Sequence, residues 1–144
     1  MEKAIDFLAT QLKASYDFLP HVQQLIPLTF FFSRVNSASS DQTKWLKLWF
    51  WQTSFSRRYS AQTDEKMDAD ITLFEQLLAG NAEGLGRYSY TVTVDQLIKQ
   101  QFTKSSPLVR AFLLLLAQNQ PIDLVNGTCD RRTRHIYASP IEKF

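Results

Sequence analysis

The chain of 144 residues has few of the side chains from which metal and redox sites are built. Its single cysteine, Cys129, allows neither an internal disulfide nor a zinc site made of cysteine ligands. The two histidines, His21 and His135, are too few for a multi-histidine metal site. Only 4 glycines are present, and those between residues 80 and 87 match neither fingerprint of a phosphate-binding loop. The sequence therefore predicts no metal and no cofactor.

The chain also lacks a strong charge of one sign and a long apolar run. Its formal net charge of +2 is too small to indicate nucleic-acid binding by itself. The apolar stretch 25–32 is interrupted by Pro27 and is far too short to span a bilayer. The first ten residues contain acids and no apolar signal core. These features predict a cytoplasmic protein without a membrane partner.

Aromatic side chains are abundant, and they gather in one stretch. Residues 44–60 have the sequence KWLKLWFWQTSFSRRYS and contain all 3 tryptophans. Leu48, Trp51, Phe55 and Tyr59 recur at helical spacings, and the other aromatic residues widen this stripe. A helix that is apolar nearly all round is buried on several sides. We therefore expect residues 44–60 to form the central helix of a helical domain.

Periodic apolar residues predict further helices on both sides of this stretch. Pro20 stops the first of them, Pro27 bends or delays the second, and Gly80 ends the fourth. Ser40 or Asp41 can cap the central helix, because a short side-chain oxygen there accepts from free backbone N–H groups. The expected helices cover residues 2–18, 22–35, 44–60, 67–80, 93–102 and 107–117.

Two of the later helices have clear start signals. Thr93 and Gln96 form a capping box, and Pro107 follows Ser106 at a first helical position. Residues 108–117 are apolar almost all round, so we expect them to form the buried pair of the core with residues 44–60. The fold prediction is an all-α, compact bundle of about five to seven helices, with at most a short β-hairpin near the C-terminus.

The connections and the tail give weaker signals. Residues 80–87 contain three glycines and indicate a surface loop, and residues 88–92 alternate as in a short strand. Asn126–Gly127 is a tight-turn signal, after which helical period is absent. We therefore expect a helical domain over residues 1–128 and, over residues 129–144, an arm that leads to an absent domain. Its apolar residues should lie back on the core or contact a neighbouring molecule; they are Ile136, Tyr137 and Phe144.

Two patterns in this chain resemble a segment of the GmrSD-type proteins. The first is the aromatic helix that runs into Phe55-Ser56-Arg57-Arg58-Tyr59-Ser60. The second is Ser106-Pro107, then Leu113-Leu114-Leu115-Leu116-Ala117, then Pro121-Ile122-Asp123 and Gly127. The resemblance covers roughly residues 26–126. It implies a restriction system against modified foreign DNA, or phage defence, in which a ParB-like nucleotide-hydrolysing domain precedes a His-Me-finger (HNH-type) nuclease domain.

The chain departs from that family in its catalytic motifs. It has neither the Asp-Gly-Gln-Gln-Arg motif of the first domain nor the His-His-Ile-Phe-Pro motif of the nuclease. Residues 134–137, Arg-His-Ile-Tyr, resemble a decayed form of the second motif, but His135 has no further ligands after it. The resemblance therefore implies a non-catalytic scaffold or linker between the two catalytic domains, of a class whose function is unknown. Its partners would be those neighbouring domains.

An alternative interpretation is a stand-alone nucleic-acid-binding helical module. Guanidinium groups suit both phosphate and the surface of a neighbouring domain, while the competing structural interpretation pairs Arg58 with an acid inside the fold. The candidate phosphate or partner contacts are Arg57, Arg58, Arg131, Arg132 and Arg134. The acids at the start of the fourth helix are interpreted as a solvated face near a positive helix end; they are Asp64, Glu65, Asp68 and Asp70.

Overall fold

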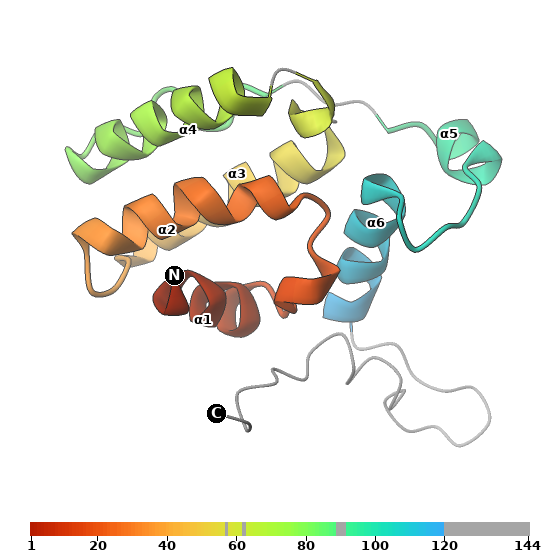
Figure 1. The fold of residues 1–144 in the computed structure, drawn as a ribbon, viewed down its shortest axis with the longest axis horizontal. Coiled ribbons are helices and arrows are strands. Elements are labelled where there is room, and N and C mark those ends of the chain that lie inside the picture. Colours follow the sequence, from red (N-terminus) through yellow and green to blue (C-terminus); the bar gives the residue numbers. More distant parts are fainter. Residues whose placement is uncertain (57, 62, 89–91, 120–144) are drawn as a thin grey trace.

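The computed structural model describes residues 1–56, 58–61, 63–88 and 92–119 (Figure 1). In these ranges the chain is all-α, as predicted, with six α-helices and no strand. Three short 3₁₀ turns accompany the helices: η1 (Tyr16–Phe18), η2 (Val22–Gln24) and η3 (Arg58–Ser60). The predicted C-terminal hairpin and the arm over residues 129–144 lie outside the described residues. The helices are α1 (Glu2–Gln11), α2 (Leu25–Arg34), α3 (Ser40–Phe55), α4 (Thr63–Leu78), α5 (Val94–Lys99) and α6 (Pro107–Gln118).

The core forms where α2 packs between α1 and α4, with α3 behind it (Figure 1). Phe31 and Phe32 of α2 are buried and meet edge to face, with ring centroids 5.2 Å apart. Phe74 of α4 contacts both Phe31 and Trp49, the latter with ring centroids 4.8 Å apart. Edge-to-face pairs of this kind add to the stabilisation that apolar burial provides. The abundance of Phe therefore serves one aromatic core.

The central helix is shorter at its C-terminal end than predicted. α3 ends at Phe55, where the Ser56 N–H still donates to the Gln52 carbonyl at 2.9 Å, and Tyr59 lies on η3 (Arg58–Ser60) instead of on the helix. The N-terminal cap is Ser39, and neither Ser40 nor Asp41 provides it. The Ser39 hydroxyl accepts from the Gln42 N–H, and the Gln42 side chain accepts from the Ser39 N–H.

The first helix is also shorter than predicted, and its end has no sequence signal. α1 stops at Gln11, because Lys13 adopts a left-handed conformation with φ of 53° and the Ala14 N–H turns back to the Leu8 carbonyl. Glycine is the usual residue in this conformation after a helix, so a lysine at position 13 gave no sign in the sequence that the helix ends there. The turn allows Leu12 and Ala14 to be buried at 1% exposure.

Pro27 and Pro107 behave as the sequence predicts, whereas Pro20 does not end the first helix, because α1 already stops at Gln11. The second helix begins late: η2 (Val22–Gln24) precedes α2, and Pro27 lies in the first turn of α2, where its missing N–H removes no helical hydrogen bond. Pro107 occupies the first turn of α6, and the Ser106 hydroxyl caps the Val109 N–H. The Thr93 capping box of α5 is present as well, although α5 ends at Lys99, before Phe102.

The predicted pairing of the two most apolar helices is only partly correct. α3 and α6 are in contact, but α6 buries one face, and Leu115 and Leu116 on its other face are exposed. The segment 80–88 is more than a surface loop, because Leu85 is buried in the core. In the same segment Gly86 has a φ of +93°, a conformation that favours glycine. A Cβ added to Gly86 would lie 3.0 Å from the Leu48 side chain, which is too close for ordinary contact.

Candidate functional site

Asp70 is the centre of the most connected polar cluster in the described residues. Its side chain is fully buried within α4, although the sequence analysis assigned it to a solvated face; that interpretation is wrong for this residue. Arg58 donates to both carboxylate oxygens, from Nη2 at 2.8 Å and from Nε at 3.2 Å. The hydroxyls of Tyr59 and Tyr88 also donate to Asp70. Together these four residues form what we call the Asp70 cluster.

The Asp70 cluster joins three segments that are separate in the sequence. Arg58 and Tyr59 come from η3, Asp70 from α4, and Tyr88 from the end of the segment 80–88. The Arg58 guanidinium also lies over the Tyr88 ring, 4.4 Å from its centroid, and donates to the Lys66 carbonyl. Because a buried carboxylate is stable only when paired and fully hydrogen-bonded, these contacts fix the relative positions of all three segments.

Burial raises the pKa values of both tyrosines of the cluster. For Tyr59 and Tyr88 the largest cause is desolvation, and the negative charge of Asp70 raises each pKa further. A phenolate at either position would lie beside a carboxylate in a dry environment. Both phenols therefore stay protonated wherever the fold persists.

These raised pKa values predict a loss of stability in alkali. In the unfolded chain both phenols ionise near pH 10, whereas in the folded chain they keep their protons. The unfolded state binds fewer protons above about pH 10, so the free energy of unfolding should fall as the pH rises through that value. Chemical denaturation at a series of pH values would measure this slope, and Tyr59→Phe should reduce it. Ionisation of both phenols without loss of helical circular dichroism would contradict the prediction.

A second buried polar cluster connects η2 to the end of α3. Gln24 is fully buried, and its Nε2 lies 3.1 Å from the Phe50 carbonyl, 2.8 Å from Thr53 Oγ1 and 2.9 Å from Ser54 Oγ. His21, also buried, packs edge to face on Tyr59, and its Nε2 has no hydrogen-bond partner among the described residues. Burial lowers the pKa of His21. The cluster is a structural one with a neutral imidazole beside it.

Of the five arginines predicted as phosphate or partner contacts, the structure describes one. Arg58 pairs with Asp70 inside the fold, as the competing structural interpretation stated, and its side chain is 17% exposed. The other four lie outside the described residues; they are Arg57, Arg131, Arg132 and Arg134. His135 and Cys129 lie outside them as well. The roles of Asp70 and Tyr88 could not be predicted from the sequence, because the spacing of charges along one helix does not show which acid is buried.

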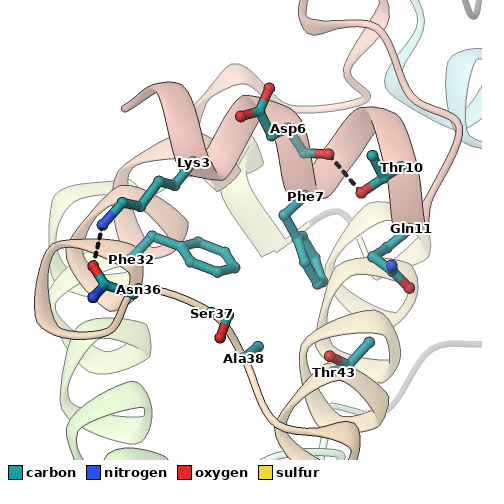
Figure 2. Close-up of a pocket in the computed structure, with 10 residues that line it drawn as sticks. All are labelled: Lys3, Asp6, Phe7, Thr10, Gln11, Phe32, Asn36, Ser37, Ala38 and Thr43. Atoms are coloured by element: carbon teal, nitrogen blue, oxygen red, sulfur yellow. Dashed lines mark hydrogen bonds between the residues drawn. The ribbon is translucent and has the colours of Figure 1, made fainter.

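A hollow of about 260 Å³ lies between α1, the loop after α2 and the start of α3 (Figure 2). Phe7 and Phe32 face each other inside it, with ring centroids 5.3 Å apart. At its rim Lys3 donates to the Asn36 side chain at 2.8 Å, and the Thr10 hydroxyl donates to the Asp6 carbonyl. The first of these hydrogen bonds joins α1 to the loop after α2 and the second lies within α1, so both have a structural role.

Apart from Leu48 on α3, the exposed large apolar side chains of the described residues fall into two sets. One set lies around the start of α1 and of α2: Met1, Tyr16, Val22 and Ile26. The other lies on α5, the segment after it and α6: Val94, Ile98, Phe102, Leu115 and Leu116. Exposed apolar side chains that gather in this way are typical of a surface that another protein segment covers.

The described part of the chain gives two further findings on possible sites. Within it, no group of three or more histidine, cysteine, aspartate or glutamate residues is placed to hold a metal ion. None of the helices in the same ranges combines the length and apolar character needed to cross a bilayer.

No protein-family model matches the chain, and no match is found among curated proteins or among solved structures. The GmrSD resemblance therefore stays a prediction from the sequence.

Proposed function

We propose that this chain is a non-catalytic helical scaffold of a GmrSD-like, modification-dependent restriction protein, and that it holds the nuclease domain through the exposed apolar surface of α5 and α6. Support comes first from the resemblance carried by residues 55–60 and 106–127. The structure adds that Arg58 and Tyr59 of the first pattern bind Asp70 and so connect η3 to α4. A motif that connects η3 to α4 makes the domain more rigid, and a scaffold between two catalytic domains must be rigid.

The observation that carries the proposal is the α5–α6 patch, which consists of Val94, Ile98, Phe102, Leu115 and Leu116. Val94 and Ile98 are 71% and 76% exposed and lie one helical turn apart on α5. The Phe102 ring contacts Phe112 of α6, with centroids 6.3 Å apart. Leu115 and Leu116 follow Phe112 by three and four residues, so they share its face of α6.

The geometry of α5 makes this patch suited to a partner. Figure 1 shows α5 at the edge of the molecule, away from α1 to α4. A short amphipathic helix that exposes its apolar side gains stability when a neighbour covers it, since isolated short helices are marginal in water. We therefore place the nuclease domain of the parent protein, whose covering surface must be apolar, against α5 and α6.

For the alternative function, nucleic-acid binding, one of the five candidate arginines is not free to bind phosphate. Arg58 is engaged by Asp70, so the alternative depends on the four arginines outside the described residues. Binding through those side chains would neutralise phosphates and would weaken steeply as the salt concentration rises. This salt dependence separates the two functions, because apolar docking through α5 and α6 is nearly independent of salt.

Calorimetric titration of this chain with the His-Me-finger nuclease domain of a GmrSD-type protein from the same genome would test the proposal. We expect binding that Ile98→Asp weakens about tenfold or more, because a carboxylate cannot be desolvated in an apolar interface. Val22→Asp is the matched control, since Val22 is exposed at 55% but lies outside the α5–α6 patch, and it should bind as the native chain does. Failure to bind the domain, or equal binding by both variants, would contradict the proposal. A parallel titration with duplex DNA at two salt concentrations tests the alternative.

A further inference from the structure

The second exposed apolar surface is hollowed and has a different position. A groove of about 410 Å³ lies between α1 and the start of α2, and we call it the α1–α2 groove. Its apolar lining comes from Met1, Ile5, Tyr16, Val22, Leu25 and Ile26. Met1, Tyr16, Val22 and Ile26 are each roughly half exposed or more. Apolar surface that is left uncovered costs free energy in water, so a segment that covers it stabilises the fold.

The described chain ends beside the C-terminal end of α1, at a short distance from this groove. Gln118, in the last turn of α6, donates from Nε2 to the Leu12 carbonyl at 2.9 Å. Leu12 caps the C-terminus of α1, and Tyr16 of the groove follows it by four residues. The chain therefore leaves α6 at one end of α1, a helix of 10 residues that is about 15 Å long. The groove lies within one helix length of that point.

The remaining sequence is long enough to reach the groove and has the composition to fill it. From Asn119 to Ile136 an extended chain spans about 55 Å, and a flexible one spans about 22 Å on average. Either length exceeds α1. Residues 136–144 then supply four large apolar side chains; they are Ile136, Tyr137, Ile141 and Phe144.

Two exposed acids that adjoin groove residues in the sequence are available to the basic segment that precedes these residues, although Lys3 and Lys13 of the same region are exposed as well. Glu2 and Asp17 are exposed, each next to a residue that lines the groove, and neither carboxylate forms an ion pair with a described residue. Basic side chains come immediately before Ile136; they are Arg131, Arg132 and Arg134. Opposite charges beside an apolar contact fix its register more than they strengthen it.

We propose that residues 136–144 of the same chain occupy the α1–α2 groove, with their apolar side chains on its lining and the three arginines near Glu2 and Asp17. The arm thereby covers an apolar surface of its own domain, and it does so whether or not the α5–α6 patch binds a nuclease domain. Intramolecular docking is favoured because the tether keeps the segment at a high effective concentration beside the groove.

The native cysteine provides a probe in the full chain. Because Cys129 is the only cysteine, a nitroxide attached to it reports where the arm lies. We expect several-fold loss of the methyl NMR signals of Ile5, Val22 and Ile26 relative to the reduced label, with no such loss at Ile98 on α5. Phe144→Asp in the arm should restore the intensity of all three groove signals. Val22→Asp removes the Val22 signal itself and should restore the intensity of Ile5 and Ile26. Loss spread evenly over the protein, or centred on another face, would overturn the proposal.

A mixing experiment separates the intramolecular contact from a contact between two chains. Nitroxide-labelled chains of natural isotopic abundance are mixed with isotope-labelled Cys129→Ser chains that carry no nitroxide. We expect the groove signals of the isotope-labelled chains to keep their intensity. If they lose intensity at Ile5 and Ile26, the occupant of the groove is the arm of a second copy, and the intramolecular assignment is wrong.

Discussion

Replacing Asp70 by alanine should lower the free energy of unfolding by about 3–5 kcal/mol, the range observed when one partner of a buried ion pair is removed. The substitution leaves the Arg58 guanidinium without its counter-ion and leaves the hydroxyls of Tyr59 and Tyr88 without their acceptor. Since globular domains are typically stable by about 5–15 kcal/mol, a change of this size is a large fraction of the total. Urea denaturation followed by circular dichroism would measure the change.

Two variants make this result specific to the buried pair. Asp68→Ala removes an exposed carboxylate two residues earlier on the same helix and should change the stability by less than about 0.5 kcal/mol. The double variant Arg58→Met and Asp70→Leu removes both charges and should recover part of the loss, because no unpaired charge then stays buried. Equal effects of Asp70→Ala and Asp68→Ala would show that Asp70 does not hold η3 and α4 together.

Replacing Trp49 by alanine should cost about 3–5 kcal/mol, because a fully buried aromatic ring is lost and a cavity remains. Trp49 lies in the centre of the aromatic core, where its indole meets Phe74 edge to face at a centroid distance of 4.8 Å. The surrounding rings come from several helices and cannot all move to close the space. The midpoint of urea denaturation would measure the loss.

Trp51 is the matched control on the same helix. It is only partly buried, and it stacks on Phe55 at a centroid distance of 6.1 Å near the end of α3. Trp51→Ala should therefore cost clearly less than Trp49→Ala. If the two substitutions destabilise the protein equally, α3 is buried on both faces, as the sequence pattern first suggested, and the placement of α3 in the bundle is wrong.

The sequence was informative about where helices begin and poor at showing where they end. Start signals are local, because a cap is one side chain bonding a backbone N–H two or three residues away; those of α5 and α6 were found correctly. The end of α1 at Gln11, just before the left-handed Lys13, and the end of α3 at Phe55 depend on tertiary contacts. In both cases the chain turns so that residues after the helix, Ala14 and Tyr59, can be buried.

The candidate site shows the same division. Aromatic density between residues 44 and 60 predicted a core helix, and the acid that Arg58 would bind was expected but could not be named. Four acids stand close together in α4, and nothing in their spacing distinguishes the buried Asp70 from its exposed neighbour Asp68. Asp70 is the acid that is buried because η3 and Tyr88 approach it from other parts of the chain. The three residues that donate to its carboxylate are Arg58, Tyr59 and Tyr88.

By itself, then, the sequence determined the all-α class, the caps that start α5 and α6, and the presence of an aromatic core. Each of these follows from side chains within a few residues of one another, where periodicity and local hydrogen bonding dominate. The tertiary structure alone decided which tryptophan is central, which carboxylate is buried, and which apolar side chains of α5, α6 and the α1–α2 groove stay exposed. Those outcomes depend on which surfaces meet, and that choice is made by contacts between residues that are far apart in the chain.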